Sequence, residues 1–156
     1  MRILILEDNA ERQTEMALVL RDRFPQYPIE FFSSAPSFLQ RMREGALADV
    51  ALIGLDHDLE MIEGESDGDL IDPGSGMDIA HAIAAVSPGP PIVIHTTNRT
   101  AGDGMEEILR TAGWRVDRVV PYGNVDWVGE IWGRRVRDAI VANVSAASPL
   151  TVDIAN

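Results

Sequence analysis

Five short apolar runs alternate along the chain with segments whose apolar residues have helical spacing. Such alternation is typical of repeated strand–helix units packed over a parallel sheet. The third run, Val50–Leu55, is almost continuously apolar, as expected for a strand that helices cover on both faces. The sequence therefore predicts a single α/β domain with a doubly wound, five-stranded parallel sheet of order 2-1-3-4-5. The predicted strands are Arg2–Leu6, Ile29–Phe32, Val50–Leu55, Ile92–Ile94 and Val116–Val120.

Capping residues and apolar rows predict a helix after each strand. A loop over Glu60–Gly74, rich in acidic residues and glycine, separates the third strand from its helix. We take residues 1–144 as the domain and leave the C-terminal tail, residues 145–156, unassigned. The predicted helices run from Asn9 to about Phe24, from Ser34 to Gly45, from a capping box at Ser75–Asp78 to before Pro88, from a capping box at Thr100–Asp103 to Gly113, and from near Asp126 to about Val144.

Composition and charge narrow the function classes. The 156 residues are 46% hydrophobic, which suits one domain with a sizeable core. Cysteine is absent, which excludes disulfides, thiolate zinc sites and a cysteine nucleophile. All 13 basic residues are arginine, which excludes a P-loop and Schiff-base chemistry. The sequence has neither a signal-peptide pattern nor a membrane-spanning run, so we expect a cytoplasmic protein.

Ionisable and polar side chains directly follow three of the predicted strands. Glu7 and Asp8 follow the first strand, Asp56–Asp58 the third and His95–Asn98 the fourth. In the order 2-1-3-4-5 these three strands are neighbours, roughly 5 Å apart. Open α/β sheets bind ligands at the carboxyl ends of their strands. The sequence therefore predicts that these residues form one polar crevice, which is the working site.

This arrangement resembles the receiver domain of two-component response regulators, with its flavodoxin-like strand order, over most of the chain. Glu7 and Asp8 match the receiver's acidic pair, which holds a divalent ion, and Asp56 matches its phosphoacceptor aspartate. Thr96 lies near the receiver's Ser or Thr after the fourth strand. Receivers place a lysine before the proline that follows strand five, whereas this chain has Val120–Pro121 and no lysine anywhere. The departure argues against phosphoryl transfer to Asp56.

The sequence is more similar to a divergent branch, the cyclic-phosphate processing receiver domain family. The similarity rests on Leu-Asp-His-Asp-Leu at Leu55–Leu59, on His95–Asn98, and on Ala112–Trp114 leading to Val120–Tyr122. The combination of His-Asp after the third strand with His-x-x-Asn after the fourth is fairly specific. The resemblance implies action on cyclic phosphates of nucleotides or of RNA ends.

Two histidines at neighbouring strand ends suit that chemistry. Opening a cyclic phosphodiester needs a base for the attacking water and an acid for the leaving oxygen, and His57 and His95 can fill these roles near neutral pH in either order. Asp58 or Asp56 would orient an imidazole. The alternative for each histidine is a neutral ring hydrogen-bonded to a loop carbonyl. We expect the phosphate oxygens to be bound by Asn98, Thr96, Thr97 and Arg99.

The carboxylates of Glu7, Asp8 and Asp56, with Asp58 as a further candidate ligand, predict a metal site. Hard oxygen ligands of this kind suit Mg²⁺ or Mn²⁺, and a mixed set with histidine would also accept Zn²⁺. The alternative is an acidic cluster that water keeps ionised and that holds no ion tightly.

The expected partner is a small cyclic nucleotide or a cyclic-phosphate RNA end. The formal net charge of −12 disfavours long nucleic acids and anionic membranes. The three tryptophans are expected mainly in the core. A homodimer through the last two helices is a further expectation, with Trp127 as a candidate contact.

Two readings of function remain open at this point. The first is a phosphoesterase for cyclic phosphates, and the second is a non-catalytic pseudo-receiver that binds a partner or a nucleotide. The loop Glu60–Gly74 leaves from the same sheet edge as the crevice. We expect it to be solvated and flexible, with a lid or a second cation site as the alternatives.

Overall fold

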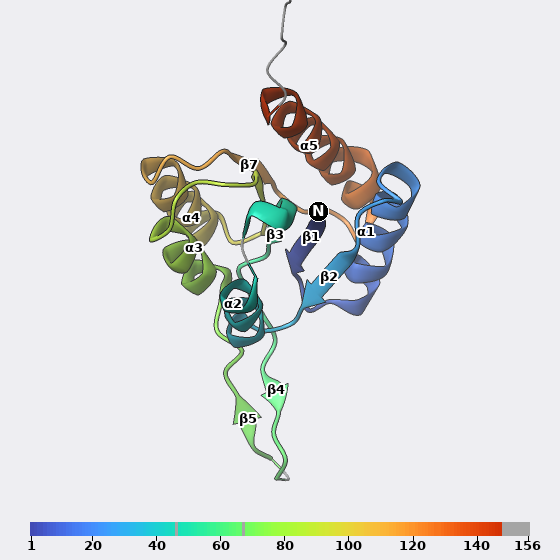
Figure 1. Cartoon of the computed structure of the whole chain (residues 1–156). Helices are drawn as coiled ribbons and strands as arrows, with labels where there is room; N and C mark the ends of the chain where they lie inside the picture. Colours follow the sequence, from blue (N-terminus) through green and yellow to red (C-terminus); the bar gives the residue numbers. More distant parts are fainter. Residues whose placement is uncertain (46, 67, 148–156) are drawn as a thin grey trace, which may run out of the picture.

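The computed structural model describes residues 1–45, 47–66 and 68–147. A five-stranded parallel sheet runs through the middle of the molecule, and helices cover both of its faces (Figure 1). The strand order is β2-β1-β3-β6-β7, which confirms the predicted order 2-1-3-4-5. The strands are β1 (Arg2–Leu6), β2 (Ile29–Phe32), β3 (Val50–Leu55), β6 (Ile92–His95) and β7 (Val116–Val119).

Two apolar cores hold the helices against the sheet. One core joins one face of the sheet to α2, α3 and α4, and the other joins the opposite face to α1 and α5 (Figure 1). All six residues of β3 are buried, as predicted for a strand covered on both faces. The helices are α1 (Ala10–Arg23), α2 (Ala35–Glu44), α3 (Gly76–Ala84), α4 (Arg99–Thr111) and α5 (Gly133–Ala147), with a 3₁₀ turn at Leu47–Asp49.

Two helices differ from the prediction at one end. Helix α4 begins at Arg99 rather than near Thr100, because the extended residue Asn98 caps it and accepts a hydrogen bond from the Ala101 amide at 3.1 Å. The last helix starts at Asp126, as predicted, and runs through a π-helical turn, Val128–Trp132, into α5, which extends to Ala147 rather than to about Val144. The rest of the predicted tail, residues 148–156, lies outside the described residues.

The segment predicted as a flexible solvated loop contains a β-hairpin. Its strands, β4 (Ile62–Glu63) and β5 (Leu70–Ile71), pair in antiparallel fashion, and all four of their residues are exposed. Figure 1 shows this hairpin projecting away from the body of the molecule. The exposure agrees with the prediction, whereas the strand pairing was not predicted.

The tryptophans lie in the core, as expected. Trp127 and Trp132 are fully buried between the sheet and α1, and Trp114 is buried on the opposite face. Burial removes Trp127 as a contact for a second copy of the chain. No helix of the described residues is long and apolar enough to cross a membrane.

Gly76 allows α3 to start against the end of β3. A Cβ atom at this position would stand 2.1 Å from the Asp56 carbonyl oxygen and 2.9 Å from the Met105 methyl carbon. The Gly76 amide also donates to the His57 carbonyl at 3.1 Å. The close approach therefore fixes the backbone that carries Asp56 and His57.

We expect Gly76→Ala to lower the free energy of unfolding by about 2 kcal/mol, because the added methyl group has no space. Urea denaturation followed by circular dichroism measures the loss. The matched control is Gly129→Ala in the π-helical turn, where a Cβ would meet nothing within 4 Å. That variant should be unchanged or more stable by about 0.5–1 kcal/mol. Equal stability of Gly76→Ala and wild type would contradict the packing described.

Candidate functional site

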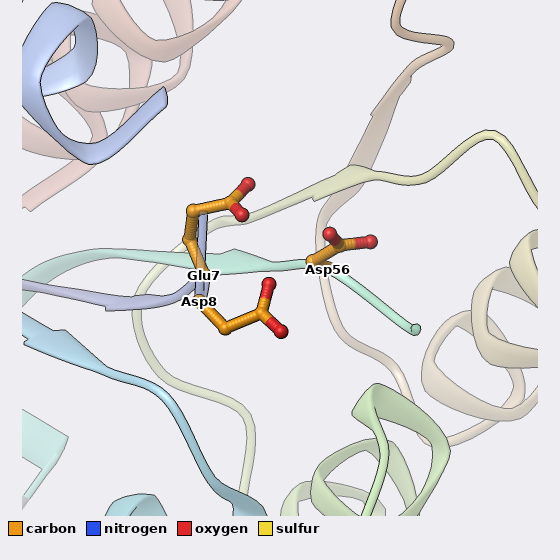
Figure 2. Close-up of side chains that lie close together, drawn as sticks. All are labelled: Glu7, Asp8 and Asp56. Carbon is orange, nitrogen blue, oxygen red and sulfur yellow. The ribbon is translucent and has the colours of Figure 1, made fainter. Parts of the chain in front are cut away.

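Three carboxylates meet at the carboxyl edge of the sheet. Glu7 and Asp8 follow β1, and Asp56 follows the adjacent strand β3 (Figure 2). One oxygen of each group lies within 4.8 Å of the others. The grouping agrees with the crevice that the strand order predicts.

Glu7 is the innermost of the three carboxylates and is wholly buried. Its Oε1 accepts from the Asn9 amide at 2.9 Å, and its Oε2 lies 3.5 Å from His95 Nε2 and 3.7 Å from Arg12 Nη1. The last two contacts are electrostatic rather than well-formed hydrogen bonds. Burial alone would raise the pKa of Glu7, but His95, the Asn9 amide and Arg12 outweigh it and hold that pKa below its usual value.

Asp56 is also buried, with 4% of its surface exposed. Burial raises its pKa to about 6, and repulsion from Glu7 adds to the rise. Attraction to His95, a 2.6 Å hydrogen bond from the His57 amide and attraction to Arg12 oppose it. The pKa of Glu7 is therefore lowered while that of the neighbouring Asp56 is raised, and the negative charge of Asp56 is only partly compensated.

Arg12 supplies the positive charge of the site, and the sequence prediction missed it. It stands in the first turn of α1, its Nη1 lies 3.4 Å from Asp56 Oδ2, and its guanidinium lies 5.7 Å from the centre of the Trp127 ring. A signal was present in the sequence. The first turn of a helix that directly follows Glu7 and Asp8 must lie over the same sheet edge.

The donor set fits a hard divalent cation. Of the three carboxylates, Glu7 and Asp56 lie within 4 Å of the one guanidinium, that of Arg12, and Glu7 Oε2 is buried without a hydrogen-bond donor among the described residues. Glu7, Asp8 and Asp56 would hold a cation that offsets the remaining negative charge, and Mg²⁺ and Mn²⁺ favour oxygen ligands of this kind.

His95 is fully buried on the face of the sheet that α1 and α5 cover. Its ring lies 6.1 Å from the Trp127 ring in a stacked arrangement and 6.2 Å from the Trp132 ring in an edge-on arrangement. Neither ring nitrogen has a hydrogen-bond partner in the described part of the chain. The nearest charge that it meets is Glu7.

His57 belongs to a different group at the rim of the site. Its Nε2 lies 3.7 Å from Asp58 Oδ1, and Asn98 Nδ2 donates to the same oxygen at 3.3 Å. Side chains two residues apart along a strand face the same side. His57 stands two residues after Leu55, which packs in the core of α2, α3 and α4, whereas His95 stands two residues after Val93, which packs in the other core. The two histidines predicted to work as a pair therefore contact separate carboxylates.

The remaining predicted residues divide between the site and its surroundings. Thr96 is buried, and its hydroxyl accepts from the Asn98 amide at 3.2 Å. Thr97 lines the open cleft in front of the carboxylates. The side-chain oxygen of Asn98 caps α4, and its side-chain NH₂ group donates to Asp58. Arg99 is exposed and does not line the cleft.

The cleft has a volume of about 280 Å³, close to the lower end of small-molecule sites. Its walls combine carboxylates with one guanidinium and one hydroxyl, and neither histidine lines it. A larger cleft of about 460 Å³ lies at the opposite end of the sheet, beside the starts of β6 and β7. The carboxylate cleft is lined by Asp8, Asn9, Arg12, Asp56, Asp58, Leu59, Glu60 and Thr97.

The raised pKa of Asp56 predicts a pH-dependent effect of Asp56→Asn. Because the folded protein binds this proton more tightly than the unfolded chain, whose reference value is 3.8, Asp56 contributes stability at low pH that is lost as the pH rises through about 6. With a chelator present, we expect the free energy of unfolding of Asp56→Asn to be higher than that of wild type by on the order of 2 kcal/mol at pH 8. At pH 4 the two proteins should differ little.

Thermal denaturation at the two pH values measures this effect. Asp49→Asn is the control of opposite sign, because a hydrogen bond from the N-terminal ammonium and further bonds from Arg2 lower the pKa of Asp49. That variant should lose stability at pH 8, and the loss should shrink as the pH falls below the unfolded value of 3.8 toward the lower folded pKa. A pH-independent difference for Asp56→Asn would contradict the burial of an uncompensated carboxylate.

Solved structures with the same fold are response-regulator receiver domains. The phosphorylated cyanobacterial phytochrome response regulator RcpA is 15% identical, with a TM-score of 0.62, over 94% of this chain and 96% of that one. A receiver domain from Rhodospirillum rubrum is 18% identical, with a TM-score of 0.60, over 96% of each chain. The N-terminal domain of a response regulator/sensory box/GGDEF protein from Carboxydothermus hydrogenoformans is 20% identical, with a TM-score of 0.62, over 95% and 100%.

At these identities the likeness concerns the fold alone. Comparison with curated proteins finds no significant match. A family model does match the sequence, over residues 2–111, which is more than half of the chain. That stretch includes β1, β3 and β6 with the polar residues at their ends. The protein therefore belongs to the cyclic-phosphate processing receiver domain family.

Proposed function

We propose that the protein hydrolyses small cyclic phosphates, either cyclic nucleotides or the cyclic-phosphate ends of RNA, with Mg²⁺ or Mn²⁺ held by Glu7, Asp8 and Asp56. The observation that carries the proposal is the cluster of three carboxylates with Arg12 beside it, at the floor of an open cleft. The family's description, cyclic-phosphate processing, supports the substrate class.

The cleft offers groups that can hold a phosphate. A bound divalent cation supplies positive charge for the phosphate oxygens. Arg12 can donate to a non-bridging oxygen, since its guanidinium faces the cleft and is about a quarter exposed. The Thr97 hydroxyl can donate to a second oxygen from the opposite wall.

Proton transfer falls to His57 in this proposal. Its side chain is 17% exposed, whereas His95 is wholly buried. His57 does not itself line the cleft, but Asp58, which lies beside its ring, does, and Asn98 holds Asp58 in place. His57 would therefore protonate the departing ribose oxygen or accept a proton from the attacking water.

His95 becomes a positioning residue. Packed against two tryptophans, it presents Nε2 to the buried oxygen of Glu7 and keeps that carboxylate ionised and aimed at the cation site. The acid–base pair predicted from the sequence is thus replaced, in this proposal, by one proton-transfer histidine and one supporting histidine.

Charge restricts the size of the substrate. The chain has no lysine or arginine between Arg43 and Arg99, and this stretch forms one whole side of the cleft from Asp56 to Thr97. A long polyanion would meet this acidic side without counter-charges. A mononucleotide or a short RNA end needs only the cation and Arg12.

A second candidate is a non-catalytic module that binds a nucleotide. The separation of the two histidines favours it, since the imidazoles lie beside different carboxylates and neither lines the cleft. A phosphorelay role for Asp56 remains disfavoured because the chain has no lysine. Labelling of Asp56 by acetyl phosphate would revive that role.

Phosphorus NMR of a substrate panel tests the proposed activity. We expect hydrolysis of at least one 2′,3′- or 3′,5′-cyclic nucleotide or cyclic-phosphate oligonucleotide with Mn²⁺ or Mg²⁺, and none with chelator. His57→Ala should lower kcat by about 100-fold or more. His81→Ala is the control, because His81 is exposed on α3 away from the cleft and should retain full activity. No product from any substrate, with metal bound, would favour the non-catalytic module.

Calorimetric titration with Mn²⁺ tests the cation site separately. We expect Glu7→Gln and Asp8→Asn each to weaken binding about tenfold or more, because each removes a charged ligand. Arg12→Met should bind the ion more tightly than wild type, since a competing positive charge is lost, and yet turn over substrate more slowly. The control is Asp22→Asn, an exposed carboxylate on α1. Wild type giving no binding heat would contradict the site.

A further inference from the structure

The hairpin of β4 and β5 exposes apolar side chains that the described residues do not cover. The exposed fractions are 50% for Met61, 38% for Ile62, 62% for Leu70 and 53% for Ile71. All four residues belong to the segment that projects from the domain as the β4–β5 hairpin (Figure 1), and Ile62 and Ile71 are cross-strand partners on one of its faces. Clustered exposed apolar residues are typical of an interaction site.

The base of the hairpin is fixed to the domain. The Glu60 amide donates to Asp8 at the entry, and the Ala35 amide donates to the Pro73 carbonyl at 2.7 Å at the exit. Within the hairpin, Ile62 pairs with Ile71, and the Gly64 amide donates to the Asp69 carbonyl at 2.8 Å. The exposed side chains are therefore presented at a defined place beside the carboxylate cleft.

The hairpin is too short to use all of its apolar side chains in its own packing. Its strands have two residues each, and an isolated two-stranded hairpin of this length is at best marginally stable in water. The outer edges of β4 and β5 have no ladder partner among the described residues. Free strand edges with apolar side chains readily pair with a further strand.

Charge decides what kind of strand can pair there. The hairpin and its base have acidic residues and no basic one, since neither lysine nor arginine occurs between Arg43 and Arg99. A second copy of this chain would bring the same negative charge, and nucleic acids and anionic membranes would be repelled in the same way. A basic partner is complementary. The acidic residues are Glu60, Glu63, Glu65, Asp69 and Asp72.

We propose that the β4–β5 hairpin docks a basic, apolar segment of another protein, which adds to its free edge as an extended strand. Main-chain hydrogen bonds to the unpaired edge would fix the segment. Because successive strand residues face opposite sides, the apolar side chains of the segment would lie on the face of Ile62 and Ile71, and its arginine or lysine side chains would lie on the face of Leu70, where Glu63 stands. This inference does not depend on the proposed hydrolysis of cyclic phosphates.

Fluorescence anisotropy with labelled hexapeptides tests the docking surface. The probe alternates arginine with valine, and the control peptides alternate glutamate with valine and arginine with serine. We expect only the arginine–valine peptide to bind well, and Leu70→Ser/Ile71→Ser to weaken it about tenfold. Leu18→Ser and Val141→Ser, at positions of similar exposure on α1 and α5, should bind it as wild type does.

Several results would overturn the proposal. These are equal binding by Leu70→Ser/Ile71→Ser, equal affinity for the arginine–serine peptide, or a dimer of the protein alone that this variant abolishes in sedimentation. Folding is controlled by melting temperature, which should not fall because both side chains are more than half exposed. Glu63→Gln/Glu65→Gln provides a second test, and it should weaken binding and reduce its dependence on salt.

Discussion

The site depends on keeping a fully buried carboxylate ionised. Glu7 lies at the end of a central strand where water cannot reach it, so its charge has to be compensated by the protein. His95 and Arg12 provide that compensation from β6 and α1, and they connect three elements around one carboxyl group. The packing of Trp127 and Trp132 against His95 extends the same constraint into the second core.

The polar residues at the sheet edge form two separate groups, the inner carboxylates and the rim residues. Asp56 lies where the similarity to receivers would place a phosphoacceptor, but its neighbours are an arginine and a second histidine-linked carboxylate rather than a lysine. The inner carboxylates suit a cation, and the rim residues His57 and Asp58 suit proton transfer. Under the proposed function, mutations could then alter cation binding and proton transfer independently.

Strand order and the grouping of Glu7, Asp8 and Asp56 were predictable, because a buried parallel sheet forces polar strand ends to one edge. The face of the sheet on which each histidine lies was not predictable. Side chains alternate between the two faces for as long as the strand continues, and β6 continues one residue further than predicted, to His95. Arg12 was missed because its contact with Asp56 is made between distant parts of the sequence. The hairpin was missed because its two-residue strands leave no periodic pattern.

The position of Trp127 has an optical consequence. Its indole is sealed from water, stacks against His95 and lies beneath the Arg12 guanidinium. Tryptophan emission is quenched and shifted by nearby charge, so any ligand that moves Arg12 or alters the charge of His95 will change the intrinsic fluorescence. Trp132, edge-on to His95, lies in the same core and would respond with Trp127, whereas Trp114 lies in the other core. The protein thus contains an unlabelled reporter of what occupies its acidic cleft.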